Sequence, residues 1–557
     1  MVASSSSDTA RKVGAFEPLR EPVFRRIWTA SLLSNFGQLI LGVGVAWEMT
    51  RLTSSPGMVA LVQTALMLPL MLVAVPAGAI ADMFDRRRVA MIGLAISMLF
   101  GAILTTLAWA GLATPWVLLA FCFLIGAGVA LYAPSWQASI GEQVVPEHLP
   151  AAVALGTISY NLARSFGPAL GGVIVLAAGA KAAFAINAVC YAPLLFAYLI
   201  WRRRHIPSRL PPERIDRAIV AGARYVLYAG SIRVVLIRAF LFGMAGATTT
   251  ALAPLIAKTM LGGDAGTYGI MLGSSGVGAV VGALTINRFR ERLGTEISTR
   301  LLAAVSGVAL VVIGLSHSLA LTCAMLGIAG GANIVTIALF NISVQLSAPR
   351  WVTARALSLF SSALTGGIAF GAWVWGSVAG EWSLSGAIVT SGVMLLAMPL
   401  VARLLPLPEV SQADVALVEL TNTPEVALAL TPRSGPVVIE IDYDVDPADA
   451  REFYGAMLKV QRVRLRNGAF GWSISRDIAD SAGWTERYQC QTWGDYLRMR
   501  ARFTQTDHTA QEHANSFDRR APADRHVRRR LERPFGSVRW RADSPDPQQQ
   551  TLGYIAP

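Results

Sequence analysis

The sequence predicts an all-α membrane protein with twelve transmembrane helices in two six-helix bundles, followed by a small cytoplasmic α+β domain. Three observations support this fold class. Of the 557 residues, 54% are hydrophobic and 15% are charged, whereas roughly a quarter are charged in soluble domains. The apolar residues fall in long runs, each near the ~20 residues that a helix needs to cross the hydrocarbon layer. After residue 410 these runs stop, and short alternating segments follow.

Turn and charge signals bound twelve apolar runs, which define the expected spans. They are 27–48, 57–81, 89–110, 115–138, 152–178, 182–201, 232–257, 266–287, 297–316, 319–342, 353–379 and 383–404. An even number of crossings places both termini on one side. Basic residues gather before the first span and after the second, sixth, eighth and tenth, whereas the opposite loops contain only Arg51, Lys181 and Lys258. Because cytoplasmic loops carry the excess of Lys and Arg, both termini are expected in the cytoplasm.

The same signals divide the chain into seven expected parts. They are a cytoplasmic arm (1–26), a first bundle (27–201), a linker (202–231), a second bundle (232–405), a second linker (406–435), an α+β domain (436–534) and a disordered tail (535–557). The linker 202–231 has apolar residues at helical spacing after three arginines, which favours an amphipathic helix on the inner leaflet; a solvated linker is the alternative.

A short charged stretch, GAIADMFDRRR (78–88), joins the second and third spans. Gly78 permits close helix crossing, and Asp82 lies one turn later, before Arg86 and Arg87. This stretch resembles the loop between the second and third helices of the major facilitator superfamily, which implies a conformational latch. Asp85 stands where many members have a second glycine. The alternative is a plain loop whose charges only fix topology.

Helix five contains NLARSFGPALGG (161–172), with Gly167, Pro168, Gly171 and Gly172 within two turns. Physically these residues indicate a kinked helix that neighbours can approach closely. The run resembles the GPxxGG motif of major facilitator antiporters, which implies export and protons as the coupling ion. The arginine that such antiporters often have in helix four is missing, because Cys122 and Leu124 stand at the corresponding positions.

Together with FRRIW (24–28), SNFGQ (34–38) and DRRRV (85–89), this motif resembles the bacterial branch that includes the enterobactin exporter, over residues 20–405. The resemblance implies a multi-pass protein of the bacterial inner membrane.

Four polar residues within the spans are candidates for substrate binding or coupling. Arg164 lies well inside helix five, where a guanidinium is costly unless it has a partner or faces water; snorkelling to a helix end is the alternative. Asn35 and Gln38 share a face of helix one, where they can bind substrate or hold helices together. Glu48 lies near the outer surface, as a gate or merely exposed. Arg238 and Glu142 invite the same interpretations.

The segment after 430 alternates strand and helix patterns in the order βαββα. It resembles the ferredoxin-like antibiotic-biosynthesis monooxygenase fold. His508 and His513 near Asp507 are better explained by a solvated helix face than by a metal site, and the four scattered cysteines indicate neither a metal site nor a disulfide framework. The basic run 519–533 suits anionic lipid, and no nucleic-acid partner is expected.

These observations favour a secondary transporter that exports a small organic molecule, siderophore-like or drug-like, by alternating access. Its expected partners are that substrate, the lipid bilayer and, from the resemblance, protons. Neither a cofactor nor enzymatic activity is expected, and the chain has no nucleotide-binding GxxxxGK[ST] loop. The alternatives are an importer of the same architecture and a membrane-anchored enzyme or sensor that acts through the carboxyl-terminal domain.

Overall fold

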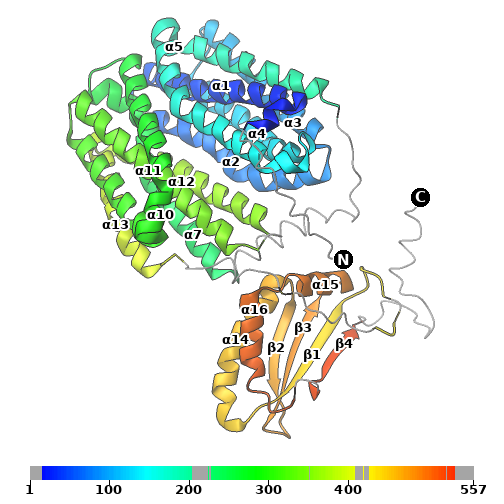
Figure 1. Cartoon of the computed structure of the whole chain (residues 1–557). Coiled ribbons are helices and arrows are strands. Elements are labelled where there is room, and N and C mark those ends of the chain that lie inside the picture. The colour runs from blue at the N-terminus through cyan, green and yellow to red at the C-terminus, as the bar shows by residue number, and fades with distance from the viewer. Residues whose placement is uncertain are drawn as a thin grey trace, which may run out of the picture. The chain divides into compact units, whose positions relative to one another are not determined.

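The computed structural model describes residues 16–202, 224, 228–349, 352–407, 418, 426–428, 430–521 and 524–532. The chain forms two compact units (Figure 1). The first, here called the membrane unit, holds residues 1–215, 235–342 and 358–407; the second, the tail unit, holds 408–557 with the short pieces 216–234 and 343–357. The expected amphipathic helix of the linker and the expected disordered tail lie outside the described residues.

Apolar helices build the membrane unit. The first half has α1 (Pro22–Leu52), α2 (Pro56–Met83), α3 (Arg86–Trp109), α4 (Pro115–Ser139) and α5 (Leu149–Ile200). The second half has α7 (Gly230–Gly246), the short α8 (Thr248–Ala251) and α9 (Ala253–Leu255), α10 (Ala265–Leu315), α11 (Leu319–Ser347), α12 (Thr353–Glu381) and α13 (Leu384–Leu404). In Figure 1 the blue-to-cyan helices of the first half lie beside the green-to-yellow helices of the second. Among the described residues, ten helices are long and apolar enough to cross a membrane.

Two of these helices are each interrupted by a glycine. Helix α5 has 52 residues and breaks at Gly179 (φ 78°), and α10 has 51 residues and breaks at Gly294 (φ 72°). Glycine adopts positive φ without a steric penalty. A straight helix of that length would extend about 78 Å, more than twice the hydrocarbon thickness. Each long element is therefore two helices joined at a glycine, as the expected pairs 152–178 with 182–201 and 266–287 with 297–316 require.

Proline and short polar residues fix where several helices begin. Pro22, Pro56 and Pro115 each stand at the start of a helix, where the missing N–H is not needed. The Ser55 side chain accepts a hydrogen bond from the Met58 amide, and that of Asp85 accepts one from the Arg87 amide. Such caps satisfy amide donors that the helix itself leaves free.

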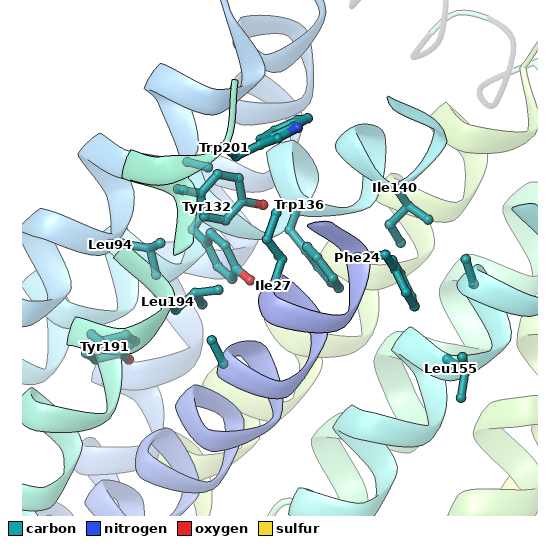
Figure 2. Packing of buried hydrophobic residues seen from close by; sticks show 14 of the residues in the cluster. Phe24, Ile27, Leu94, Tyr132, Trp136, Ile140, Leu155, Tyr191, Leu194 and Trp201 are labelled. Carbon is teal, nitrogen blue, oxygen red and sulfur yellow. The ribbon is translucent and has the colours of Figure 1, made fainter. Parts of the chain in front are cut away.

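The core of the first half is an apolar cluster shared by α1, α3, α4 and α5 (Figure 2). Phe24 and Ile27 of α1 are almost fully buried there with Leu94 of α3 and Tyr198 of α5. Close helix contacts elsewhere rely on glycine. A Cβ on Gly93 would lie 2.6 Å from the carbonyl oxygen of Gly128, so α3 and α4 can touch only because both positions lack side chains.

The tail unit contains a four-stranded antiparallel sheet with helices packed on it. Its elements are β1 (Val437–Asp444), α14 (Ala450–Asn467), β2 (Phe470–Arg476), β3 (Gly483–Cys490), α15 (Trp493–Ala501), α16 (Gln505–Asn515) and β4 (Val527–Leu531). The strand order is β2-β3-β1-β4, with Ile439 opposite both Tyr488 and Arg529. Alternate residues of β1, including Ile439 and Tyr443, are buried against the helices.

The tail differs from the sequence-based expectation in two places. The expected second helix is two helices, because the chain turns after Ala501 and Thr504 begins α16 with a capping box to Asp507. The basic run contains the unexpected strand β4, whose Arg528 and Arg530 pair with carboxylates of β1. Part of the positive charge expected to bind lipid is therefore neutralised within the sheet.

Candidate transport site

The charged stretch between α2 and α3 holds helices of the first half together. The guanidinium of Arg86 donates to the Ala138 carbonyl (2.9 Å) and to Glu142 (3.1 Å) at the end of α4. Arg87 donates to the carbonyls of Tyr198 (2.7 Å) and Leu199 (2.8 Å) at the end of α5. These carbonyls would otherwise lack partners, because they belong to the last helical turn. Gly78 and Asp82 fall in α2, but their side chains are outside the described part of the chain.

The second half has a related cluster at the corresponding helix ends. Arg238 of α7 is 2% exposed and donates to Glu296 (2.5 Å) and Thr299 (3.0 Å) of α10. Glu296 also accepts from Arg300 (2.6 Å), and Arg300 donates to the Ala402 carbonyl (3.1 Å) near the end of α13. As Arg87 does in the first half, Arg300 joins the start of one helix to the end of another. Each half thus has its own group of arginines that join its helix ends, Arg86 and Arg87 in the first half and Arg238 and Arg300 in the second.

The glycines of helix five are packing positions between three helices. A Cβ on Gly167 would lie 2.9 Å from the Leu39 Cβ of α1, and one on Gly171 would lie 3.0 Å from the Val43 Cβ. A Cβ on Gly172 would lie 2.3 Å from the Cα of Gly269 in α10. The motif therefore brings α1 to one side of α5 and the second half of the membrane unit to another. Pro168 stands between these contacts inside the helix.

Further contacts join the two halves toward the connection between α1 and α2. The Thr64 hydroxyl of α2 donates to the Ala369 carbonyl of α12 (2.8 Å), and Trp47 stacks on Tyr268 with ring centroids 6.2 Å apart. Lys258 donates to the carbonyl of Thr50 at the end of α1. The halves are therefore closed on each other at the end of the unit that lies away from Pro22.

On a helical projection, Arg164 lies opposite the lipid-facing side of α5. It lies fifteen residues after the start of the helix and fifteen before Gly179, about 22 Å from each. The apolar side chains of Leu162, Phe166 and Val173 are 41%, 48% and 63% exposed, as expected for a lipid-facing surface. With about 100° of rotation per residue, Arg164 lies about 160–180° from all three.

The direction of Arg164 falls between the neighbours of α5. On a helical projection it lies between Gly171, which faces α1, and Gly172, which faces α10. Tyr160 and Asn161 are exposed and lie within about 60° of it. Among the described residues, the half-buried Arg164 guanidinium has no hydrogen-bond or ion-pair partner. A charge at this depth without a partner must face water or a polar ligand.

Helix α1 carries a second polar candidate. Gln38 is half-buried, has no hydrogen-bond partner in the described part of the chain, and shares its helix face with Gly42. A Cβ on Gly42 would meet no atom within 4 Å, so this face of α1 borders open space. The Asn35 amide instead donates to the buried Ser159 hydroxyl of α5 (3.3 Å), which favours its role in holding helices together.

Glu48 is neither exposed nor near Arg164. Its side chain is buried in α1 near the contacts between the halves and accepts an ion pair from Arg51 at 3.2 Å. The merely exposed alternative for Glu48 is therefore wrong. The sequence analysis did not single out Tyr160 and Ser159. Their helical spacing from Arg164 and from the lipid-facing residues could have identified them as candidates.

The side chains of the α16 residues His508 and Asp507 contact other residues of the tail unit. His508 faces Glu512 (3.3 Å) on α16, while Asp507 is held by Arg466 and Asn467. Among the described residues, no group of three His, Cys, Asp or Glu side chains is placed to hold a metal ion.

Comparison with known proteins identifies the family. The major facilitator family described as "Transmembrane secretion effector" matches residues 13–535. The chain belongs to the major facilitator superfamily. As a major facilitator protein it is a multi-pass membrane transporter, and the transporter prediction is confirmed at this level.

Relatives and solved structures agree with this family. The staphyloferrin A transporter of Staphylococcus aureus is 26% identical over 286 residues, 51% of this chain and 71% of the relative. The multidrug efflux pump Tap of Mycolicibacterium fortuitum is 25% identical over 391 residues, 68% of this chain and 94% of the relative. A bacterial homologue of the human lysosomal transporter Spinster, solved in an inward-facing conformation, has a TM-score of 0.54 at 14% identity and covers 69% of this chain and 96% of its own. That structural similarity supports the major facilitator fold.

Proposed function

We propose that this major facilitator protein is a secondary active exporter of a small organic molecule of the siderophore or drug class. It works by alternating access, with twelve crossings in two six-helix bundles, both termini in the cytoplasm of a bacterial cell and protons as the coupling ion. The similarity to a staphyloferrin A transporter and to multidrug efflux pumps supports both the substrate class and export. The enterobactin-exporter branch remains the proposed position within the family.

The observation that carries this proposal is the position of Arg164. By residue count and helical projection, Arg164 belongs to the middle of α5, on the side opposite the lipid-facing residues and between the directions of α1 and α10. A guanidinium binds carboxylates strongly because two parallel hydrogen bonds supplement the charge. We therefore assign Arg164 to an anionic group of the substrate, with Gln38, Tyr160 and Asn161 as neutral hydrogen-bonding groups beside it.

The contacts between the halves support an inward-facing conformation of the membrane unit. They gather toward the α1–α2 connection, which is the outer side if the termini are cytoplasmic. The unit is then inward-facing, and export requires these contacts to open while the opposite ends come together. Gly78, Asp82, Arg86 and Arg87 act as a latch at those inner ends, and Glu48 with Arg51 belongs to the outer gate.

For the tail we propose a cytoplasmic ferredoxin-like domain over residues 436–534, joined to the second bundle by 406–435. The alternation β1-α14-β2-β3-α15-α16-β4 and the antiparallel order β2-β3-β1-β4 support that fold.

The experiment that tests the function is an efflux assay on a panel of siderophore-like and drug-like compounds. Cells with and without the gene are loaded, and loss of each compound is followed under imposed pH gradients. We expect faster loss of at least one anionic compound, and faster still when the pH gradient drives proton entry. Inverted membrane vesicles should accumulate the same compound.

Two results would contradict the proposal. Equal retention of every compound with and without the gene would reject export of this substrate class. Gene-dependent uptake by intact cells, with no accumulation in inverted vesicles, would identify an importer instead.

A further inference from the structure

The tail unit contains a cavity that the transport function does not use. Its volume is about 370 Å³, within the range of small-molecule sites. It lies between the helix-covered face of the sheet and helices α15 and α16, and all its lining residues fall within 441–529. The cavity therefore belongs entirely to the folded core of the tail.

Aromatic side chains form much of its wall. Tyr443, Tyr488 and Tyr496 are almost fully buried and line the cavity together with Phe503. Hydrogen bonds fix two of the rings: the Tyr443 hydroxyl donates to Glu486 (3.2 Å), and the Tyr496 hydroxyl accepts from Arg529 (2.8 Å). Rigid, flat walls of this kind favour a planar ligand over a flexible aliphatic one.

The floor of the cavity is a buried and neutralised ion pair. Arg464 donates two hydrogen bonds to Glu486 (3.0 and 3.2 Å) and a third to Gln511 (2.5 Å). Its guanidinium also lies over the Tyr488 ring, 4.8 Å from the centroid. Burial by itself would lower the pKa of the Arg464 guanidinium, but the adjacent Glu486 carboxylate and the neighbouring tyrosines raise that pKa above its ordinary value, so Arg464 stays charged. This pair orients the wall and leaves the net charge of the floor near zero.

Four further ionisable side chains line the cavity besides Arg529: His508 faces Glu512, Arg525 pairs with Asp518, and Arg500 lies over the Tyr496 ring. On the face of β4 opposite Arg529, Arg528 pairs with Asp442 (2.6 Å) and Arg530 pairs with Glu440 (3.2 Å). Arg529 points to the cavity side, where it bonds the Tyr496 hydroxyl and lies 5.9 Å from that ring's centroid. It has no carboxylate partner among the residues that the structure describes, so the cavity has an uncompensated cation at its edge.

We propose that this cavity binds a small planar organic anion, such as an aromatic carboxylate, with Arg529 on the anionic group and the tyrosines and Phe503 against its ring. The occupant is chosen by the charge of Arg529, the flat aromatic walls and the volume together. The site is independent of the transport site at Arg164.

The test uses the full chain, purified in lipid nanodiscs and carrying Arg164→Ala so that the membrane site is removed. Binding of radiolabelled salicylate is measured by equilibrium dialysis. We expect one saturable site per chain. Arg529→Gln should weaken binding about tenfold or more, because it removes a charge-assisted hydrogen bond. The matched control is Arg528→Gln, one residue away on the opposite face, which should bind as the parent does.

A second variant guards against misfolding. Tyr496→Phe keeps the ring and removes only the hydroxyl that holds Arg529, so it should weaken binding severalfold. Absence of saturable binding in the parent, or equal loss in the Arg528 and Arg529 variants, would overturn the proposal. Displacement of salicylate by inorganic phosphate at equal concentration would overturn the planar class of ligand. Binding that persists in a protein without efflux activity leaves this inference intact, so the two proposals fail separately.

Discussion

Arg164 in α5 and Arg238 in α7 are both inside helices of the membrane unit, yet their surroundings differ. Arg238 is buried and bound by Glu296 and Thr299 in its own half. Arg164 is half-buried, has no partner in the described part of the chain and lies opposite the lipid-facing residues of α5 on a helical projection. A buried charge with a bonded partner is already satisfied, whereas one without a partner requires water or a ligand. The contrast supports a structural role for Arg238 and agrees with the transport role that we propose for Arg164.

The largest effect is expected from Arg164→Ala. Loss of a charge-assisted hydrogen bond to the substrate should lower the efflux rate about 10- to 100-fold. Arg164→Lys keeps the charge but not the paired hydrogen bonds, so its efflux rate should lie between those of the parent and Arg164→Ala. The control is Phe166→Ala, at the same depth on the lipid-facing side. Normal efflux by Arg164→Ala, measured at matched protein levels, would remove the assignment.

Gly269→Val should have the next largest effect, because it disturbs the contact between the halves without touching Arg164. A Cβ at this position would lie 2.8 Å from the Cα of Gly172. Overpacking costs about 1–3 kcal/mol, which should slow transport about tenfold by disfavouring the closed outer side. The control is Gly42→Ala, whose Cβ meets open space. Single cysteines introduced on the outer side should react faster with a water-soluble thiol reagent in Gly269→Val than in the parent. Equal labelling rates in the two proteins would contradict the closed contact.

Asp82→Asn tests the proposed latch and should act on turnover more than on folding. Interfacial ion pairs contribute about 1 kcal/mol or less, so efflux should fall up to about fivefold while thermal stability is kept. The measurement is initial efflux rate against melting temperature in the same preparation. Wild-type flux in this variant would contradict the latch and would favour a loop whose charges only fix topology.

The smallest effect on transport per folded molecule is expected from Glu296→Gln, which breaks the pair around Arg238. Leaving a buried guanidinium without its carboxylate should cost about 3–5 kcal/mol of stability. Thermal unfolding in detergent should show this loss, and the nearby exposed Glu291→Gln should not. If Glu296→Gln instead kept its stability and lost efflux, the assignment of Arg238 to structure would be wrong.

The sequence predicted the apolar helices and singled out Arg164 as a charge inside one of them, because both are local patterns; the transport role of Arg164 stays a prediction. It could not find the partner of Arg238, since Glu296 lies 58 residues away and only folding brings the two together. Glu48 could be placed near a helix end by counting residues, but its burial depends on packing between the halves.

The strand β4 was missed for a different reason. Its sequence, VRRRL, lacks the alternation of apolar and polar residues that indicates a strand. The structure explains the exception: carboxylates on β1 neutralise Arg528 and Arg530, and Arg529 lies beside Tyr496. Charge complementarity across the sheet here replaces apolar alternation, and no single segment of sequence reveals it.

The contact of Gly172 with Gly269 has a mechanical consequence. The two backbones meet here without side chains between them, so no side chain is inserted between α5 and α10 at this contact when the halves separate. Under the proposed alternating access, α5 and α10 would separate at this glycine contact together with the contacts of Thr64, Trp47 and Lys258. The hydrogen bonds of Arg86, Arg87, Arg238 and Arg300 stay within one half, so separation of the halves leaves them unbroken.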